Sequence, residues 1–250
     1  MRIILAVFFS LTLFIACNRQ AQPEDQATET VLTVASGTVK RLADFESKYV
    51  TKRNVDIWLP DDYSTTEKYA VLYMHDGQLL FDSTDTWNKQ EWGVDEALSA
   101  LLQNGEVRKT IVVGVWNISK ERHADYFPQK PFESLPKELQ DSLLQANRGP
   151  DQPLFGTDVR ADHYLKFLVE ELKPYIDANF STLTEAEHTF VAGSSMGGLI
   201  SMYAICEYPE VFSGAACIST HWPGTFTVEN NPIPAAFRSY LQANLPDPTT

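Results

Sequence analysis

Short, continuous apolar segments recur along the sequence, and they restrict the fold more than any other feature. Segments of this kind are typical of strands that are covered on both faces of a parallel sheet. Amphipathic helical patterns lie between them, at residues 94–102 and 164–176. This alternation predicts one α/β domain with a mostly parallel central sheet, right-handed crossovers and helices on both faces. The apolar segments are residues 69–74, 110–115, 189–192 and 214–218.

Other patterns surround this α/β core. Residues 38–45 and 49–59 are rich in β-branched and aromatic residues with polar residues at intervals, which predicts an antiparallel hairpin, and residues 235–243 have a helical pattern. Residues 117–158 are rich in proline and polar residues and follow a predicted parallel strand. We expect them to lie over the carboxyl edge of the sheet as a lid or substrate wall. Pro174 is expected to shorten or kink the second core helix.

The N-terminus has the pattern of a bacterial lipoprotein signal. Residues 1–16 combine a short basic start with an apolar stretch that is too short to span a membrane. The stretch runs into Phe-Ile-Ala-Cys, which resembles the lipobox before a lipidated cysteine, here Cys17; an ordinary signal peptide with a chance cysteine is the alternative. We expect residues 1–16 to be a signal peptide, residues 17–30 a lipidated, flexible tether and residues 31–250 the domain. The protein would then be extracytoplasmic, in the periplasm or at the cell surface, and anchored to a bacterial membrane without spanning it.

The charge and the cysteines exclude several kinds of partner and site. A formal net charge of −13 repels nucleic-acid phosphates, and no basic run offsets it locally, so we expect no nucleic-acid partner. Cys206 and Cys217 lie in apolar sequence on a predicted helix and the next strand, which favours buried free thiols over a disulfide. The sequence contains no Cys/His spacing typical of a metal site.

The strongest chemical motif is G-x-S-x-G, formed by Gly193, Ser195 and Gly197. It follows a strand pattern and precedes a helix pattern, as in the sharp turn that exposes a nucleophilic serine. Glycines at both flanking positions avoid side chains that would collide in such a turn, and the helix N-terminus stabilises negative charge. Ser195 is therefore the predicted nucleophile, with a non-catalytic Gly/Ser-rich turn as the alternative.

A second motif, His75-Asp76-Gly77-Gln78, ends the first apolar strand. In an α/β-type serine hydrolase, the loop after such a strand and the residue after the nucleophile each supply a backbone N–H to the oxyanion hole. Gln78 and Met196 are the predicted donors. Asp76 is expected to shape the loop through hydrogen bonds to backbone amides or to line the substrate pocket, and His75 to shape the loop or line the same pocket.

The two motifs together, YMHDGQLLFD from Tyr73 and AGSSMGG from Ala192, resemble an esterase family of the α/β-hydrolase superfamily. This family includes carbohydrate acetyl and feruloyl esterases, enterochelin esterases and mycolyltransferases. The likeness runs from about Val55 to the end of the chain. It implies an α/β-hydrolase fold and hydrolysis of a carboxylic ester without a cofactor. We expect a small-molecule or carbohydrate ester as the substrate.

The resemblance also implies a catalytic acid and then a histidine, on loops after two further strands. Only 55 residues follow Ser195, with one strand pattern among them, so we expect the sequence to stop before the final strands and to expose a sheet edge. The alternative general base is His221, which with Trp222 is otherwise expected to line the substrate pocket. Asp247 is a weaker alternative for the acid. His123, His163 and His188 are expected on the surface or at helix ends.

Three functions remain open from the sequence. The first is ester hydrolysis through Ser195 and an acyl-enzyme, and the second is a non-catalytic binding lipoprotein that keeps the fold. The third is transfer of the acyl group to a sugar instead of water by the same residues. Trp87, Trp92 and Trp116 could form aromatic walls for a sugar or a phenolic acyl group, although core or rim positions explain them equally well.

Overall fold

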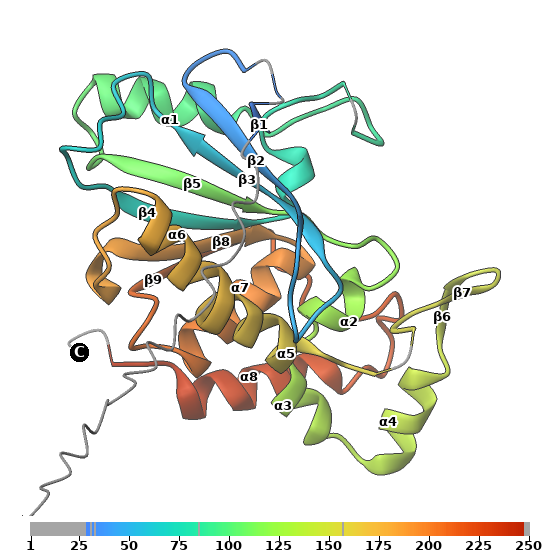
Figure 1. Ribbon diagram of the computed structural model, residues 1–250. Coiled ribbons are helices and arrows are strands. Elements are labelled where there is room, and N and C mark those ends of the chain that lie inside the picture. Colours follow the sequence, from blue (N-terminus) through green and yellow to red (C-terminus); the bar gives the residue numbers. More distant parts are fainter. Residues whose placement is uncertain (1–28, 31, 33, 85, 157, 248–250) are drawn as a thin grey trace, which may run out of the picture.

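The computed structural model describes residues 29–30, 32, 34–84, 86–156 and 158–247 (Figure 1). The predicted signal peptide, Cys17 and all but the last two residues of the predicted tether lie outside the described residues, so these assignments stay predictions. Those last two, Glu29 and Thr30, form a short strand, so strand pairing begins inside the predicted tether. Within the described ranges, no helix combines the length and the apolar character needed to cross a membrane.

A seven-stranded mixed sheet forms the centre of the molecule, in the order β1-β2-β3-β5-β4-β8-β9. The pairs β1–β2, β2–β3 and β3–β5 are antiparallel, whereas the pairs β5–β4, β4–β8 and β8–β9 are parallel. The predicted N-terminal hairpin and the predicted parallel core are both confirmed. The strands are β1 (Glu29–Thr30), β2 (Thr38–Phe45), β3 (Arg53–Leu59), β4 (Ala70–His75), β5 (Thr110–Val115), β8 (Thr189–Ser194) and β9 (Gly214–Ile218).

Helices cover both faces of this sheet, as predicted (Figure 1). Helix α1 (Val94–Gln103) connects β4 to β5 and lies on one face, whereas α7 (Met196–Glu207) connects β8 to β9 and lies on the other with the helices of residues 161–179. The connection from β4 to β5 moves along the sheet toward β1, whereas the connections from β5 to β8 and from β8 to β9 move toward the β9 edge. Right-handed crossovers that move in opposite directions place their helices on opposite faces. Helix α8 (Ile233–Asn244) packs beside α7 and beside α3 (Gln129–Glu133).

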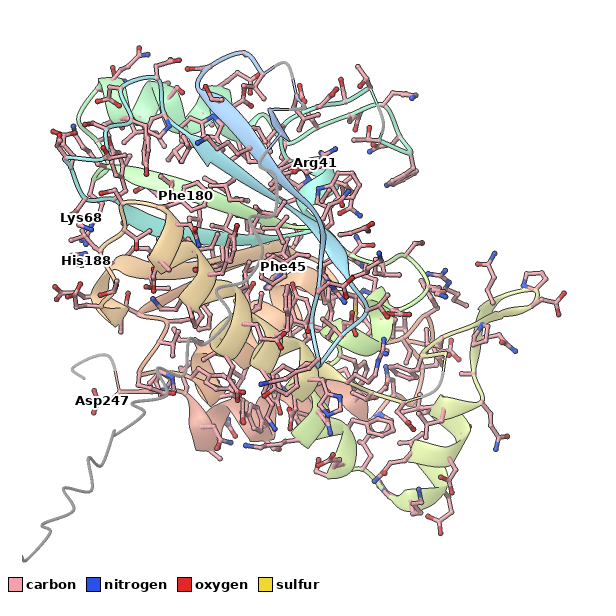
Figure 2. The ribbon with its side chains drawn as sticks, viewed as in Figure 1. Arg41, Phe45, Lys68, Phe180, His188 and Asp247 are labelled. Atoms are coloured by element: carbon pink, nitrogen blue, oxygen red, sulfur yellow. The ribbon has the colours of Figure 1, made fainter. Side chains whose placement is uncertain are left out.

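Alternate residues of β4, β5 and β8 supply two separate cores. In β4, Val71 and Tyr73 belong to the large core under the helices of residues 161–207, whereas Met74 belongs to the smaller core under α1. Phe45, at the end of β2, extends the large core, because its ring packs edge-on against Phe167 and Tyr175 with centroids 6.0 Å and 5.3 Å apart (Figure 2). This two-sided burial explains why the strands are continuously apolar in sequence.

The helical stretch of residues 161–179 neither ends nor shortens at Pro174. It comprises α5 (Ala161–Lys166), a π-helical segment (Phe167–Leu172) and α6 (Lys173–Asn179). Pro174 stands in the first turn of α6, where a missing N–H is tolerated, and the π-helical winding directly before it accommodates the ring. The expected shortening is therefore absent, and the local change in helical winding lies directly before Pro174.

Strand β9 forms one edge of the sheet in the described part of the chain. Ala216, Cys217 and Ile218 are exposed there, and Ile218 keeps 42% of its accessible surface. Both cysteines are free, as predicted, but Cys206 is only half-buried and Cys217 is exposed. The expectation of a buried thiol was wrong for Cys217, because no described strand or helix covers this part of β9, and it held only in part for Cys206, near the end of α7.

The carboxyl ends of β4, β5 and β8 meet at one edge of the sheet, and the chain after β5 folds over it (Figure 1). Lys68 and His188 precede β4 and β8 at the opposite edge (Figure 2). The segment after β5 contains α2 (Arg122–Tyr126), α3 (Gln129–Glu133), α4 (Lys137–Leu144) and the two short strands β6 (Asn147–Gly149) and β7 (Gln152–Pro153).

Candidate active site

Ser195 occupies a strained turn between β8 and α7. Its φ and ψ are 58° and −116°, a conformation that non-glycine residues rarely adopt and that clusters at functional sites. The turn is so tight that a Cβ on Gly193 would lie 2.6 Å from the carbonyl oxygen of Gly197. The backbone N–H of Ser195 donates to Ile218 and its carbonyl accepts from His221, which fixes the turn to the end of β9. The local sequence therefore folds as the motif predicts.

The loop after β4 faces this turn. Asp76 has left-handed backbone angles (φ 61°, ψ 43°), and Gly77 begins a single 3₁₀ turn that contains Gln78. Only glycine fits at position 77, because a Cβ there would lie 2.5 Å from the backbone of Gly114 in β5. Gln78 and Ser195 line the same cavity, so the loop and the nucleophile turn open onto one space.

Asp76 holds this loop through side chains, and not through the backbone amides that we predicted. The Nε and Nη2 groups of Arg122 each donate to the Asp76 carboxylate at 2.7 Å, and the side-chain amide of Asn117 donates at 2.7 Å. The backbone N–H of Asp76 donates to the Tyr126 hydroxyl at 3.3 Å. These partners all come from the segment after β5, so that segment fixes the shape of the predicted oxyanion loop. Bidentate arginine–carboxylate pairs are among the strongest such contacts.

Two cavities meet at Ser195. The larger has a volume of about 610 Å³ and the smaller about 160 Å³, and Arg122 lines both. The larger is lined by Asp76, Gln78, Leu79, Thr86, Trp87, Asn88, Trp92, Asn117, Ser119, Arg122, Ser194 and Ser195. The smaller is lined by Arg122, His123, Arg148, Ser195, Met196, His221 and Phe226.

Tryptophans line the larger cavity, but Trp222 is not one of them. Trp87 and Trp92 keep 86% and 43% of their surface exposed at its wall. Trp116 lines an adjacent cavity, where its indole N–H donates to Asp56 at 2.8 Å. Trp222, which we predicted in the substrate pocket, is 38% exposed and lines neither cavity at Ser195.

Three histidines, at positions 75, 123 and 221, lie near the candidate site in different environments. His75 is buried and bonds through Nδ1 to the Tyr164 hydroxyl at 2.9 Å, and burial lowers its pKa to about 4. It lines neither cavity at Ser195. His123 is also buried, against the expectation of a surface position, because residues 224–226 cover α2. Its Nε2–H donates to the Gly224 carbonyl at 2.8 Å, and burial lowers its pKa to about 4.

The structure brings His221 close to Ser195 without joining their side chains. His221 lines the smaller cavity, but its Nε2–H donates to the Thr225 carbonyl at 3.2 Å. Among the described residues, no side chain hydrogen bonds to the Ser195 hydroxyl. Asp247, the weaker alternative for the acid, follows α8 and lines neither cavity (Figure 2).

Sequence reasoning anticipated the wall of this site but not its individual residues. Residues 117–158 were expected to lie over the sheet edge, and Asn117, Arg122 and Arg148 do so. No local pattern distinguishes these side chains from other polar residues of the segment. No group of three or more His, Cys, Asp or Glu side chains suited to a metal ion occurs among the residues that the structure describes.

Comparisons with known proteins agree with this architecture. The family model described as "Putative esterase" matches residues 47–144 and 151–246. The uncharacterized protein YbbA of Bacillus subtilis is 27% identical over 179 residues, which cover 71% of this chain and 59% of YbbA. The chain thus spans less than two thirds of the length of this relative.

Solved structures of esterases and related hydrolases share the fold. An IroE-like serine hydrolase from Shewanella oneidensis superposes with a TM-score of 0.54 and 23% identity, over 84% of this chain and 70% of that one. A ferulic acid esterase from Anaeromyces mucronatus superposes with a TM-score of 0.51 and 17% identity, over 88% and 84% of the two chains. The family match covers most of the sequence, and the fold is that of the α/β-hydrolases, so this chain belongs to the esterase family.

Proposed function

We propose that the protein hydrolyses a carboxylic ester, with Ser195 as the nucleophile. The strained backbone of Ser195, open to the cavity that the oxyanion loop also lines, carries this proposal. The Ser195 oxygen attacks the acyl carbon, and the backbone N–H groups of Met196 and Gln78 stabilise the charge that develops on the carbonyl oxygen. The alcohol leaves with a proton, and water then releases the acid from the acyl-enzyme.

The attack needs a general base to take the Ser195 proton. Two described histidines, His123 and His221, line the smaller cavity together with Ser195. His221 is the better placed of the two, because its backbone N–H donates to the Ser195 carbonyl at 3.1 Å, whereas His123 is buried and donates to the Gly224 carbonyl. His221 would have to exchange its contact with the Thr225 carbonyl for one with the Ser195 hydroxyl. A base contributed from outside the described residues is the alternative, and one experiment separates the two.

A fluorophosphonate probe tests the proposal directly. We expect the probe to modify Ser195, as identified by mass spectrometry of the labelled peptide, because only an activated serine reacts at an appreciable rate. His221→Asn should abolish labelling if His221 is the base and leave it unchanged if another group is. A folded protein that takes up no probe would contradict the proposal and favour the non-catalytic binding protein.

We further propose that the alcohol part of the ester is a carbohydrate. Trp87 and Trp92 present large exposed ring surfaces to the larger cavity, and Asn88 and Asn117 supply polar groups beside them. Exposed aromatic faces with neighbouring amides suit the apolar ring faces and the hydroxyls of sugars.

Trp87→Ala is expected to raise KM for an acetylated or feruloylated oligosaccharide about 10-fold, because a stacked aromatic contact contributes on the order of 1 kcal/mol or more. The turnover of methyl acetate, whose alcohol part has no ring to stack on the tryptophans, should stay within about twofold of the wild-type value. Steady-state kinetics with both esters check this. Equal effects on the two esters would contradict a role in binding the sugar.

A further inference from the structure

The smaller cavity at Ser195 is locally basic in an acidic protein. The chain carries a formal net charge of −13, but the residues that line this cavity include two arginines and two histidines and no carboxylate. Phe226 and Met196 supply its apolar wall. A cavity of this composition beside a nucleophile favours a ligand with a negative charge at one end.

The two arginines of this cavity differ in how they are bound. Arg122 uses Nε and Nη2 to hold Asp76, so its charge is already paired. Arg148, on strand β6, makes one hydrogen bond to a described residue, from Nη1 to the Ser119 carbonyl at 3.3 Å, and it joins none of the ion pairs among the described residues. Arg41, Arg53 and Arg160, by contrast, are each paired with a carboxylate.

An arginine with an unpaired fork beside a nucleophile can bind a carboxylate through two parallel hydrogen bonds. We propose, on the basis of the proposed function, that the acyl part of the substrate ends in a carboxylate that Arg148 binds. The larger cavity with its tryptophans then holds the alcohol part, and the smaller cavity holds a short dicarboxylic acyl group. Ser195 lies between them, where both cavities reach it.

A matched pair of esters tests this assignment. The first is the mono-4-nitrophenyl ester of glutaric acid, and the second is the same compound with its free carboxylate converted to a methyl ester. Their reacting groups are the same, and they differ in the terminal charge. Spontaneous hydrolysis is subtracted with the Ser195→Ala protein as the blank.

We expect the wild-type protein to prefer the charged ester in kcat/KM. Arg148→Gln should lower the charged-to-neutral ratio of kcat/KM about 10-fold, the lower end of what a hydrogen bond between charged groups contributes, because Arg148 is exposed to solvent. Arg148→Lys should retain part of the preference, and high salt should reduce it in the wild type. Arg238→Gln removes the same charge from an exposed position on α8, far along the chain from β6, and should leave the ratio unchanged.

Two outcomes would overturn the carboxylate site at Arg148, and only one of them would also overturn the proposed esterase activity. If both esters are hydrolysed and the ratio is the same in wild type and Arg148→Gln, the carboxylate site is wrong and the esterase proposal stands. If neither ester is hydrolysed and the fluorophosphonate probe does not modify Ser195, both proposals are wrong.

Discussion

Replacing Ser195 with alanine is expected to reduce hydrolysis of 4-nitrophenyl acetate by at least about 10³-fold. The alanine keeps the backbone N–H groups of the oxyanion loop and both cavities, so substrate binding survives. It removes the oxygen that forms the acyl-enzyme. The neighbouring Ser194 lines the same cavity but belongs to β8 and does not occupy the strained position. The expected loss is therefore in kcat, with KM little changed. Stopped or continuous assays of 4-nitrophenol release measure both constants.

Ser213→Ala is the matched control for this change. Ser213 is exposed and precedes β9, at the sheet edge opposite Ser195, and its hydroxyl makes a long contact of 3.4 Å to the Thr189 carbonyl. Its loss should leave kcat within about twofold of wild type, since surface substitutions rarely have larger effects. An Ser195→Ala protein that keeps more than a tenth of the wild-type kcat would contradict the nucleophile assignment.

Breaking the buried ion pair between Arg53 and Asp125 is expected to lower the free energy of unfolding by about 3–5 kcal/mol. Arg53 Nη2 lies 3.0 Å from the Asp125 carboxylate, and both side chains are fully buried. Asp125→Leu fills a similar volume but leaves the Arg53 charge without its partner, and Arg53 Nη1 already has no hydrogen-bond partner among the described residues. Removal of one member of a buried pair is costly because the other charge stays desolvated.

Two further variants show whether charge or packing causes the loss. The double variant Arg53→Met/Asp125→Leu removes both buried charges and should recover much of the stability, since Arg160, which also pairs with Asp125, keeps its pair with Glu121. Asp141→Asn breaks the pair between Lys137 and Asp141, whose side chains are 71% and 51% exposed, and should cost about 0.3–0.5 kcal/mol. Urea unfolding measures all three. A decrease in the free energy of unfolding of less than about 1 kcal/mol for Asp125→Leu would contradict the proposed contribution of the buried pair to stability.

The Arg53–Asp125 pair also connects the fold to the site. Asp125 lies on α2, one turn after Arg122, which holds Asp76 in the loop opposite Ser195. Arg53 lies on β3, in the antiparallel part of the sheet. The ion pair therefore ties the segment after β5 to the sheet, and the segment in turn fixes the loop.

The sequence predicted the elements of the fold well because each carries its own local pattern. The strands β5 and β9 match the predicted bounds, and helix α1 differs from them by one residue. Patterns failed where a neighbour decides the outcome. Cys217 looked buried because apolar strand residues usually are, but its exposure depends on what lies beside β9. Pro174 was expected to shorten or kink a helix that instead adopts a π-helical segment directly before it.

The residues of the candidate site also fall into those that a local pattern predicted and those that depend on distant neighbours. Ser195, Gly193 and Gly77 were predictable because a tight turn restricts its own residues, whatever surrounds it. Asn117, Arg122 and Arg148 were not, because they lie in a segment without periodic pattern and act on residues far along the chain. Asn117 and Arg122 bind Asp76, 41 and 46 residues away, and Arg148 lies 47 residues before Ser195. His123 was misplaced for the same reason, since its burial comes from residues 224–226.

The sequence by itself determined the order of strands and helices along the chain, the nucleophile turn and the loop that faces it. Backbone sterics and side-chain periodicity act over a few residues, so the local sequence contains the information for these features. Only the tertiary structure decided which charges pair, which histidines are buried and which arginine remains available beside Ser195. Those properties depend on burial and on distances between residues that are remote in the chain, and the packing of the whole domain sets both.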